Sequence, residues 1–354
     1  MTDHETSTEE TTRGIELTPE HAPERMGELA GVAEREGFDV AFASSHYFNR
    51  DPFVALTKMA EATETIELGP GIVNPYDTHP VRLASQAATI DEVSDGRGVF
   101  GIGAGDRSAL SNLGYDHERP LRRVLESFDV ARDLWAGETI THEGTFTARD
   151  ASLNLEPREL PVYVGAQGPH MLRMSAKHAE GVLINAAHPR DLEWAAGEIE
   201  QGLEEREAQS ASERASEERS DSRDGEFESL AFASVSVAGD ETEAREAARP
   251  PVAFIAGGAA EPVLERHDID REAASAVSDA LEQGNLHEAF GHVTPAMIDA
   301  FCIAGTTETI ADRFEAALEY VDGIVVGSPL GPDLEDAIER ASEALATAAE
   351  RRSE

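Results

Sequence analysis

Short apolar segments alternate with amphipathic segments along most of the chain. The apolar segments are predicted strands, and the amphipathic ones are predicted helices because their apolar residues recur at helical spacing. A strand plus its helix repeats with a period of about 30 residues in the first part of the chain. The predicted strands are residues 13–17, 39–43, 66–68, 98–103, 160–164, 181–184, 230–237 and 323–326. Eight strands alternating with helices predict an α/β fold of the parallel (β/α)8 TIM-barrel type.

Three segments depart from this alternation. Residues 1–12 are polar and acidic, and we expect a disordered tail. Residues 208–226 are rich in Ser, Glu and Arg, and we expect a disordered surface excursion. Residues 250–300 are predicted to form a helical insertion between the seventh strand and the last strand-helix pair. The remaining pattern predicts a single barrel domain over residues 13–345.

The charge of the chain is strongly acidic. The chain has 70 Asp and Glu against 29 Lys and Arg, a formal net charge of −41. This sign argues against nucleic acid and anionic membrane surfaces as partners. Lys58 and Lys177 are the only lysines, and the acidic residues alternate with small ones, which suits hydration in concentrated salt, where repulsion is screened to ~3 Å at 1 M. We predict a halophilic source; the alternative is simply an acidic enzyme.

Several classes of site and location are disfavoured by what the sequence contains. Cys302 is the single cysteine, so neither an internal disulfide nor a CxxC metal site is expected, and it is predicted to be a small core residue. No His, Asp and Glu spacing indicates a metal site. The motifs of serine hydrolases, P-loop proteins and zinc proteases do not occur. No apolar run approaches the ~20 residues of a membrane span, and the N-terminus does not resemble a signal peptide, so we expect a cytoplasmic protein.

The segment of residues 66–80 combines features that a plain strand does not have. Gly69, Pro70 and Gly71 interrupt its apolar run, which predicts a bulge or a close approach of the backbone to a ligand. Polar side chains crowd the turn that follows: Asn74, Tyr76, Asp77 and His79. Pro80 then begins an amphipathic helix. The alternative is a strand with an irregular exit.

Polar or glycine-rich sequence follows nearly every predicted strand, whereas the strand beginnings carry nothing notable. The positions are Glu16, the turn at residues 46–49, Asn74, Asp106, Gln167, Asn185 and Ser328. The loops at the carboxyl ends of barrel strands lie on one face, where barrel enzymes build their sites. The pattern therefore predicts an enzyme with its active site on that face.

At this level of detail the sequence resembles the archaeal methylenetetrahydromethanopterin reductases, in a haloarchaeal form. The matching segments occur in order over about residues 13–345: Gly14-Ile15-Glu16-Leu17, residues 68–76, residues 101–106, residues 165–169, Val252-Ala253-Phe254-Ile255, Glu265-Arg266-His267 and residues 326–333. That family has barrels of the bacterial-luciferase-like type and uses the deazaflavin coenzyme F420. The resemblance implies hydride transfer from reduced F420 to 5,10-methylenetetrahydromethanopterin, which gives the 5-methyl form.

The resemblance also implies roles for individual residues. A non-prolyl cis peptide would fall at Gly71-Ile72, in a bulge that backs the deazaflavin ring. Glu16 would be the acid that protonates the pterin, and Glu126 matches a second family glutamate with a catalytic role. The cofactor-binding residues implied are His46, Gly71, Ile72, Asn74, Asp106, Ala166, Gln167, Gly168 and Asn185. Backbone N–H groups of residues 165–168 would hold the phosphate of F420 at the start of the following helix.

Some positions depart from the family pattern and leave the substrate open. Ser45 stands where relatives carry Asp, and Arg107 and Ala109 stand where Lys and Thr are usual. The carrier of the one-carbon unit is therefore tetrahydromethanopterin or tetrahydrofolate, and an F420-dependent alcohol or sugar dehydrogenase is a further alternative. A barrel that has lost its activity would have lost its strand-end residues, but Glu16 and Gln167 are present. By the same resemblance we expect a homo-oligomer, either a dimer or a tetramer.

Overall fold

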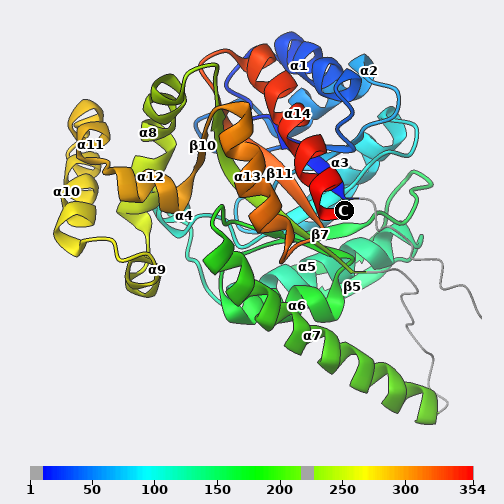
Figure 1. Ribbon diagram of the computed structural model, residues 1–354. Helices are drawn as coiled ribbons and strands as arrows, with labels where there is room; N and C mark the ends of the chain where they lie inside the picture. The colour runs from blue at the N-terminus through cyan, green and yellow to red at the C-terminus, as the bar shows by residue number, and fades with distance from the viewer. Residues whose placement is uncertain (1–10, 217–226, 354) are drawn as a thin grey trace, which may run out of the picture.

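A closed parallel sheet forms the centre of the molecule in the computed structural model, which describes residues 11–216 and 227–353 (Figure 1). Its strands have the order β3-β2-β1-β11-β9-β8-β7-β4, and β10 pairs with β9 outside this path. The strands are β1 (Thr12–Glu16), β2 (Val40–Ala43), β3 (Glu67–Pro70), β4 (Phe100–Gly103), β7 (Val162–Ala166), β8 (Gly181–Ile184), β9 (Glu228–Val237), β10 (Ile303–Gly305) and β11 (Gly323–Leu330). The predicted (β/α)8 barrel is thereby confirmed.

The barrel closes between β3 and β4 on both sides of the irregular stretch after Leu68. Leu68 donates to the carbonyl of Arg97 (2.8 Å) and accepts from Val99 (3.0 Å). Val73 donates to the carbonyl of Gly101 (3.1 Å) and accepts from Gly103 (2.9 Å). The glycines predicted to mark a bulge therefore lie in the closing seam of the barrel.

Helices cover the outside of the barrel, and most begin at a proline, which is tolerated there because the first helical N–H has no partner to lose. Outside the predicted insertion they are α1 (Pro23–Arg35), α2 (Pro52–Ala62), α3 (Pro80–Val93), α4 (Arg107–Asn112), α5 (Pro120–Trp135), α6 (Pro169–His178), α7 (Pro189–Ser216), α13 (Thr307–Leu318) and α14 (Leu334–Ser353). Alternate strand residues pack under these helices, as Ile15, Ala41 and Val326 do. The others fill the barrel interior around Phe42, Leu183 and Val325.

The predicted insertion is helical and has its own small core. It contains α8 (Glu241–Gly258), α9 (Glu261–Arg266), α10 (Arg271–Glu282), α11 (Leu286–His292) and α12 (Pro295–Phe301). Apolar side chains such as Val252, Val277 and Met297 form a cluster separate from the barrel core. The helices stand to one side of the barrel (Figure 1). Helix α8 begins at Glu241, before the predicted start of the insertion at residue 250.

Two features were not predicted. Strands β5 (Ile140–Glu143) and β6 (Thr147–Ala151) form an antiparallel hairpin after α5. Their sequences, ITHE and TARDA, are too polar to be recognised as strands, because the hairpin packs only a few apolar side chains against the barrel helices. Strand β10 has three residues, which is too short for a periodic pattern, and it begins directly after Cys302. Cys302 is fully buried, as expected of a core residue.

The boundaries of the two predicted disordered segments need correction where the structure describes them. Thr12 belongs to β1 and lies opposite Gly323, so the barrel begins one residue earlier than predicted; residues 1–10 lie outside the described part. Helix α7 continues to Ser216, so the excursion predicted for residues 208–226 begins as helix, and residues 217–226 lie outside the described part. None of the described helices is long and apolar enough to cross a membrane.

Candidate active site

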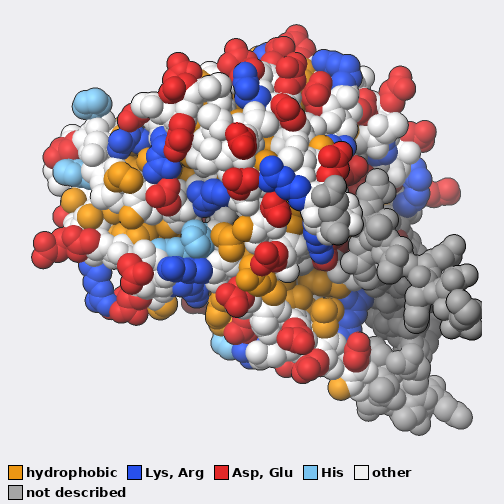
Figure 2. All heavy atoms as spheres, viewed as in Figure 1, with side chains coloured by type: hydrophobic (Ala, Val, Ile, Leu, Met, Phe, Trp, Pro, Cys, Tyr) orange, Lys and Arg blue, Asp and Glu red, His pale blue; other side chains and the backbone are white. Residues whose placement is uncertain are grey.

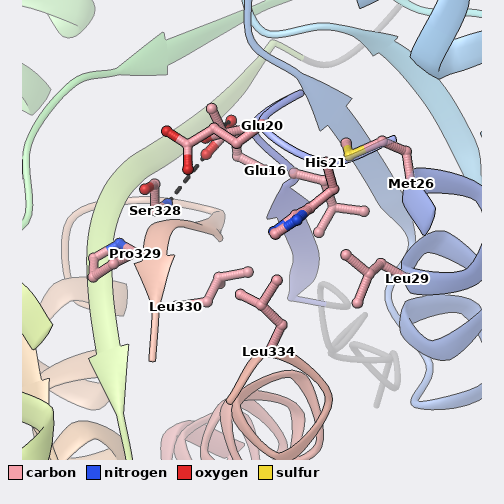
Figure 3. Close-up of a pocket in the computed structure, with 11 residues that line it drawn as sticks. Glu16, Glu20, His21, Met26, Leu29, Ser328, Pro329, Leu330 and Leu334 are labelled. Atoms are coloured by element: carbon pink, nitrogen blue, oxygen red, sulfur yellow. Dashed lines mark hydrogen bonds between the residues drawn. The ribbon is translucent and has the colours of Figure 1, made fainter. Parts of the chain in front are cut away.

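Glu16 ends β1 and is 3% exposed. Because β1 and β11 are parallel neighbours, with Ile15 opposite Val326, the carboxyl ends of both strands meet at the same face. One carboxylate oxygen, Oε2, accepts from the backbone N–H of Ser328 on β11 (3.1 Å), and the other accepts from the hydroxyl of Thr18 (2.7 Å) (Figure 3). The predicted acid therefore lies at the barrel mouth and is held from two sides.

The peptide bond between Gly71 and Ile72 is cis, as the resemblance implied. The side chain of Ile72 lies over the ends of two neighbouring strands, since a Cβ on Gly103 or Gly165 would be within 3.0–3.1 Å of its carbon atoms. A Cβ on Gly71 would meet Phe42 at 2.7 Å. Because these glycines have no Cβ, the bulge packs closely against the top of the barrel core, and the side chain of Ile72 forms an apolar surface there.

The loop after β2 carries buried polar atoms that the protein leaves unpaired. Among the described residues, Ser44 Oγ and Asn49 Nδ2 are buried without a hydrogen-bond partner. Buried polar groups are nearly always paired, so such atoms next to a strand end suggest a ligand partner. His46, on the same loop, is exposed and stacks on Phe48 with ring centroids 5.4 Å apart. Phe48 is 69% exposed, which leaves this aromatic pair open to a ligand at the mouth.

Asn74 and Asp106 were predicted to bind the cofactor. In the structure their side chains make hydrogen bonds within their own loops. Asn74 Oδ1 accepts from the backbone N–H groups of Tyr76 (3.0 Å) and Asp77 (3.2 Å), and its Nδ2 donates to the Asp77 carboxylate (2.9 Å). Asp106 caps α4 by accepting from the N–H of Ala109 (2.6 Å). Both residues lie after strand ends at the mouth, and their structural role there is to hold the loops.

Four residues predicted to bind the cofactor lie at the end of β7 or in the loops after β7 and β8. The methyl group of Ala166 is buried between the sheet and the helices, so only its backbone can face the mouth. Its carbonyl accepts from the N–H of Asn185 (3.2 Å), which joins the two loops. Gln167 and Asn185 are exposed. Gly168 caps α6 and faces open space, because a Cβ there would meet nothing within 4 Å.

Glu126 does not have the surroundings of a proton donor. Its Oε2 accepts from the N–H (2.6 Å) and hydroxyl (2.7 Å) of Thr145 and lies 3.2 Å from His142 Nε2, while Arg122 donates to Oε1. Burial alone would raise the pKa of Glu126, but these hydrogen bonds outweigh it and lower the pKa to about 2. The carboxylate is therefore ionised near neutral pH and anchors the β5–β6 hairpin, which disfavours the catalytic role predicted for it.

A polar cluster that was not predicted as a unit joins the insertion to the barrel. Asp191, at the start of α7, accepts from Arg266 and lies 2.7 Å from His267 Nε2. The guanidinium of Arg266 lies 4.7 Å from the ring centre of Trp194. Burial raises the pKa of Asp191, but the contacts with His267 and Arg266 lower it further than burial raises it. His267 thus makes a structural hydrogen bond to a residue that is far away in sequence.

Comparisons with known proteins agree with this architecture. The luciferase-like monooxygenase family model matches residues 4–350. The 5,10-methylenetetrahydromethanopterin reductase of Archaeoglobus fulgidus is 40% identical over 332 residues, 92% of this chain and 96% of the relative. The solved structure of the coenzyme F420-dependent tetrahydromethanopterin reductase from Methanopyrus kandleri superposes with a TM-score of 0.84 at 35% identity, covering 95% of this chain and 99% of that one.

Another relative matches over a shorter span. The F420-dependent glucose-6-phosphate dehydrogenase of Microbacterium testaceum is 31% identical over 186 residues, 48% of this chain and 55% of the relative. The reductases, in contrast, match along nearly the whole length, including the helical insertion. The barrel, its cis peptide bulge and these matches together lead to one conclusion: the chain belongs to the luciferase-like monooxygenase family, and it is 36–40% identical over 92% of its length to members that are 5,10-methylenetetrahydromethanopterin reductases.

Proposed function

We propose that the protein is an oxidoreductase that transfers a hydride from reduced coenzyme F420 to 5,10-methylenetetrahydromethanopterin and releases the 5-methyl form. The observation that carries the proposal is the 40% identity with a reductase named for this substrate over 92% of the chain. The placement of Glu16 at the barrel mouth supports it, because an acid is needed there.

The mouth fits a flat, polar-edged cofactor such as F420. Ile72 offers an apolar surface, and the unpaired Ser44 Oγ and Asn49 Nδ2 can pair with polar atoms of the ring. Gly168 leaves open space at the start of α6, where backbone N–H groups favour a phosphate. When bound, F420 supplies a hydride and no single electrons, so the protein must orient the ligands and exclude water.

Glu16 is the proton donor in this proposal. Opening the five-membered ring of the methylene-pterin to an iminium requires a proton on the departing nitrogen, and general acid catalysis of such a step is typically worth 10²–10⁴-fold. The hydrogen bonds from Thr18 and Ser328 fix the direction of the carboxyl group. In this proposal Glu126 takes no part in the step, because its carboxylate accepts hydrogen bonds from Thr145 of the hairpin.

An assay decides which carrier holds the one-carbon unit, tetrahydromethanopterin or tetrahydrofolate. Anaerobic oxidation of reduced F420 in molar KCl is followed with methylenetetrahydromethanopterin and, separately, with methylenetetrahydrofolate. We expect turnover with the methanopterin. Turnover with the folate alone would assign the enzyme to methyl-group biosynthesis, and F420 binding without turnover on either would leave an alcohol or sugar dehydrogenase as the candidate.

The acid is tested in the same assay with Glu16→Gln, which keeps the shape and removes the proton. We expect kcat to fall by about 10²–10⁴-fold while F420 still binds, as measured by its fluorescence. The matched control is Glu24→Gln on the exposed first turn of α1, which should keep wild-type kcat. A wild-type rate for Glu16→Gln would remove Glu16 from the mechanism.

The quaternary structure and location belong to the proposal as well. We infer a homo-oligomer, dimer or tetramer, acting in the cytoplasm on a pterin-type carrier, with no nucleic acid or membrane partner. The net charge of −41 supports the last point, because it repels anionic polymers and lipid surfaces. Light scattering on the protein in molar KCl measures the subunit number.

A further inference from the structure

A pocket lies on the outer side of Glu16, between the β1–α1 loop and the end of β11 (Figure 3). It has a volume of about 50 Å³, and its lining includes Glu16, Thr18, Glu20, His21, Ser328 and Leu334. Figure 3 shows the ring of His21 projecting into this space between Glu16 and Leu334. Since a water needs about 10–15 Å³ of such volume, the pocket has room for a few waters.

Thr18 connects Glu16 to this pocket. Its hydroxyl lies 2.7 Å from Glu16 Oε1, and the residue is partly exposed, whereas Glu16 is 3% exposed. A hydroxyl group can accept one hydrogen bond while it donates another, so it can pass a proton in either direction. Glu20 and His21 follow two and three residues later and are both exposed.

The proposed function creates a need for such a connection. An acid at the mouth becomes a carboxylate in each turnover and must regain its proton, while a cofactor and a pterin bound at the mouth beside Ile72 would cover that side. The opposite side of Glu16 faces the pocket, whose lining includes Leu17, Met26 and Leu29 on the outer side of the barrel.

We propose that Glu16 regains its proton through this pocket, with the hydroxyl of Thr18 as the last link and His21 and Glu20 as the groups that exchange protons with solvent. After Glu16 has given its proton to the pterin nitrogen, the Thr18 O–H bond breaks and a new O–H bond forms on Glu16 Oε1. Thr18 takes a replacement proton from a water or from the His21 imidazolium. No electrons move in this sequence, and one proton enters from solvent for each one transferred.

The charged groups around the pocket belong to three elements. Arg50 donates to the backbone carbonyl of Glu20 from the β2–α2 loop. Arg25 on α1 pairs with Glu335 on α14 (2.7 Å), next to Leu334. These side chains are held by their own partners, so the exchangeable groups on the lining are Glu16, Glu20 and His21.

The test is Thr18→Val, which keeps the shape and removes the hydroxyl, compared with Thr18→Ser, which restores it. Infrared difference spectra of the protein without ligands report the hydrogen bonding of the Glu16 carboxyl group, assigned with Glu16→Gln. Because Thr18 donates to Glu16 Oε1, we expect the carboxyl bands to shift in Thr18→Val and to keep their wild-type positions in Thr18→Ser.

Kinetics then test the relay itself. We expect about a tenfold loss of kcat in Thr18→Val with a larger solvent deuterium isotope effect, and a rate within twofold of wild type in Thr18→Ser. His21→Gln should lower kcat most at low buffer concentration and recover with added imidazole. The matched control is His287→Gln on the exposed surface of α11, which should change neither value.

The outcomes separate this inference, which rests on the proposed function, from that function itself. If wild type turns over but Thr18→Val keeps its kcat and isotope effect, the pocket is not the proton route and the proposed function stands. If buffer does not rescue His21→Gln, His21 is not an exchange group. If wild type does not oxidise reduced F420 with either pterin, the proposed function fails first.

Discussion

At the residue scale, the role of a carboxylate depends on the hydrogen-bond donors around it. Glu16 and Glu126 both follow from one family resemblance, yet one accepts from two groups at the barrel mouth and the other from Thr145, His142 and Arg122 at the hairpin. Sequence cannot separate them, because Thr145 is distant from Glu126 along the chain and its position depends on how the hairpin packs.

Glu126→Gln should destabilise the protein with little effect on kcat. The pKa of Glu126 falls from 4.5 to about 2 in the folded state, so its contribution is complete above pH 4.5 and is lost as the pH falls towards 2. We expect a loss of about 1–2 kcal/mol at neutral pH, after allowance for solvent screening. Urea unfolding at several pH values measures it, and the difference from wild type should shrink below pH 4.5.

The control for that variant is Glu143→Gln, which removes an exposed ion pair with Arg149 on the same hairpin. Because both side chains are largely in water, the change in unfolding free energy should stay below about 0.5 kcal/mol. A loss equal to that of Glu126→Gln would mean that any charge removed from the hairpin has this effect.

Gly101 is needed because of the backbone that crosses it. A Cβ at this position would lie 1.9 Å from the carbonyl oxygen of Pro70, in the seam that closes the barrel. Backbone cannot yield as a side chain end can, so Gly101→Ala should cost about 3 kcal/mol or more in unfolding free energy. Thermal unfolding by circular dichroism measures this.

Two glycines serve as comparisons for Gly101→Ala. Gly197→Ala, in an open position of α7, should stabilise the protein by about 0.5–1 kcal/mol through helix propensity. A Cβ at Gly103 would meet side-chain atoms of Ile72 at 3.0 Å and the carbonyl oxygen of Gly165 at 3.3 Å, so Gly103→Ala should fall between the two. If Gly101→Ala were as stable as wild type, the backbone contact would not be a constraint.

At the scale of elements, the insertion is attached to the barrel through Asp191 as well as through its own core. Asp191 is 13% exposed in its side chain and holds both Arg266 and His267 at the end of α9. Removing the carboxylate charge would weaken the contacts of Asp191 with both Arg266 and His267. Asp191 is therefore a main point of attachment between α7 and α9, beside the contacts that Arg190 and Trp194 make with Arg266.

Asp191→Asn should loosen α9 and the segment after it. We expect the amide hydrogens of residues 261–270 to exchange about tenfold faster, because the opening free energy falls by roughly 1.4 kcal/mol. Mass spectrometry of exchanged peptides measures this. Asp268→Asn is the matched control, since its side chain is 91% exposed and 4.0 Å from Arg190; unchanged exchange in Asp191→Asn would place the attachment elsewhere.

At the scale of the whole molecule, acidic side chains are spread over the visible surface rather than gathered in one patch (Figure 2). With a net charge of −41, their mutual repulsion opposes the compact state at low ionic strength. Salt relieves this repulsion because the screening length falls from ~10 Å at 0.1 M to ~3 Å at 1 M.

Stability should therefore rise with KCl. We expect Tm to increase by roughly 5 °C or more between about 0.1 M and 1 M KCl, with most of the gain at the lower concentrations. Differential scanning calorimetry measures it. A Tm independent of salt would overturn the halophilic interpretation and leave an ordinary acidic enzyme.

The sequence by itself determined the features that depend on local pattern. The strand and helix period predicted the barrel, the prolines marked helix starts, and the polar residues after each strand predicted the face that carries the site. The matches around Gly71 and Ile72 predicted the cis bond. Such features depend on neighbouring residues or on a periodicity that every strand shares, so the order of residues along the chain is enough to predict them.

Only the tertiary structure decided which distant residues meet. The N–H of Ser328 fixes Glu16, Thr145 captures Glu126, and Asp191 pairs with Arg266 across the boundary of the insertion. The polar hairpin and the three-residue β10 also escaped prediction, since their strands are stabilised by what they pair with rather than by their own pattern. Hydrogen bonds between residues far apart in sequence require the closed barrel to bring their partners within 3 Å or so, and no local pattern encodes that closure.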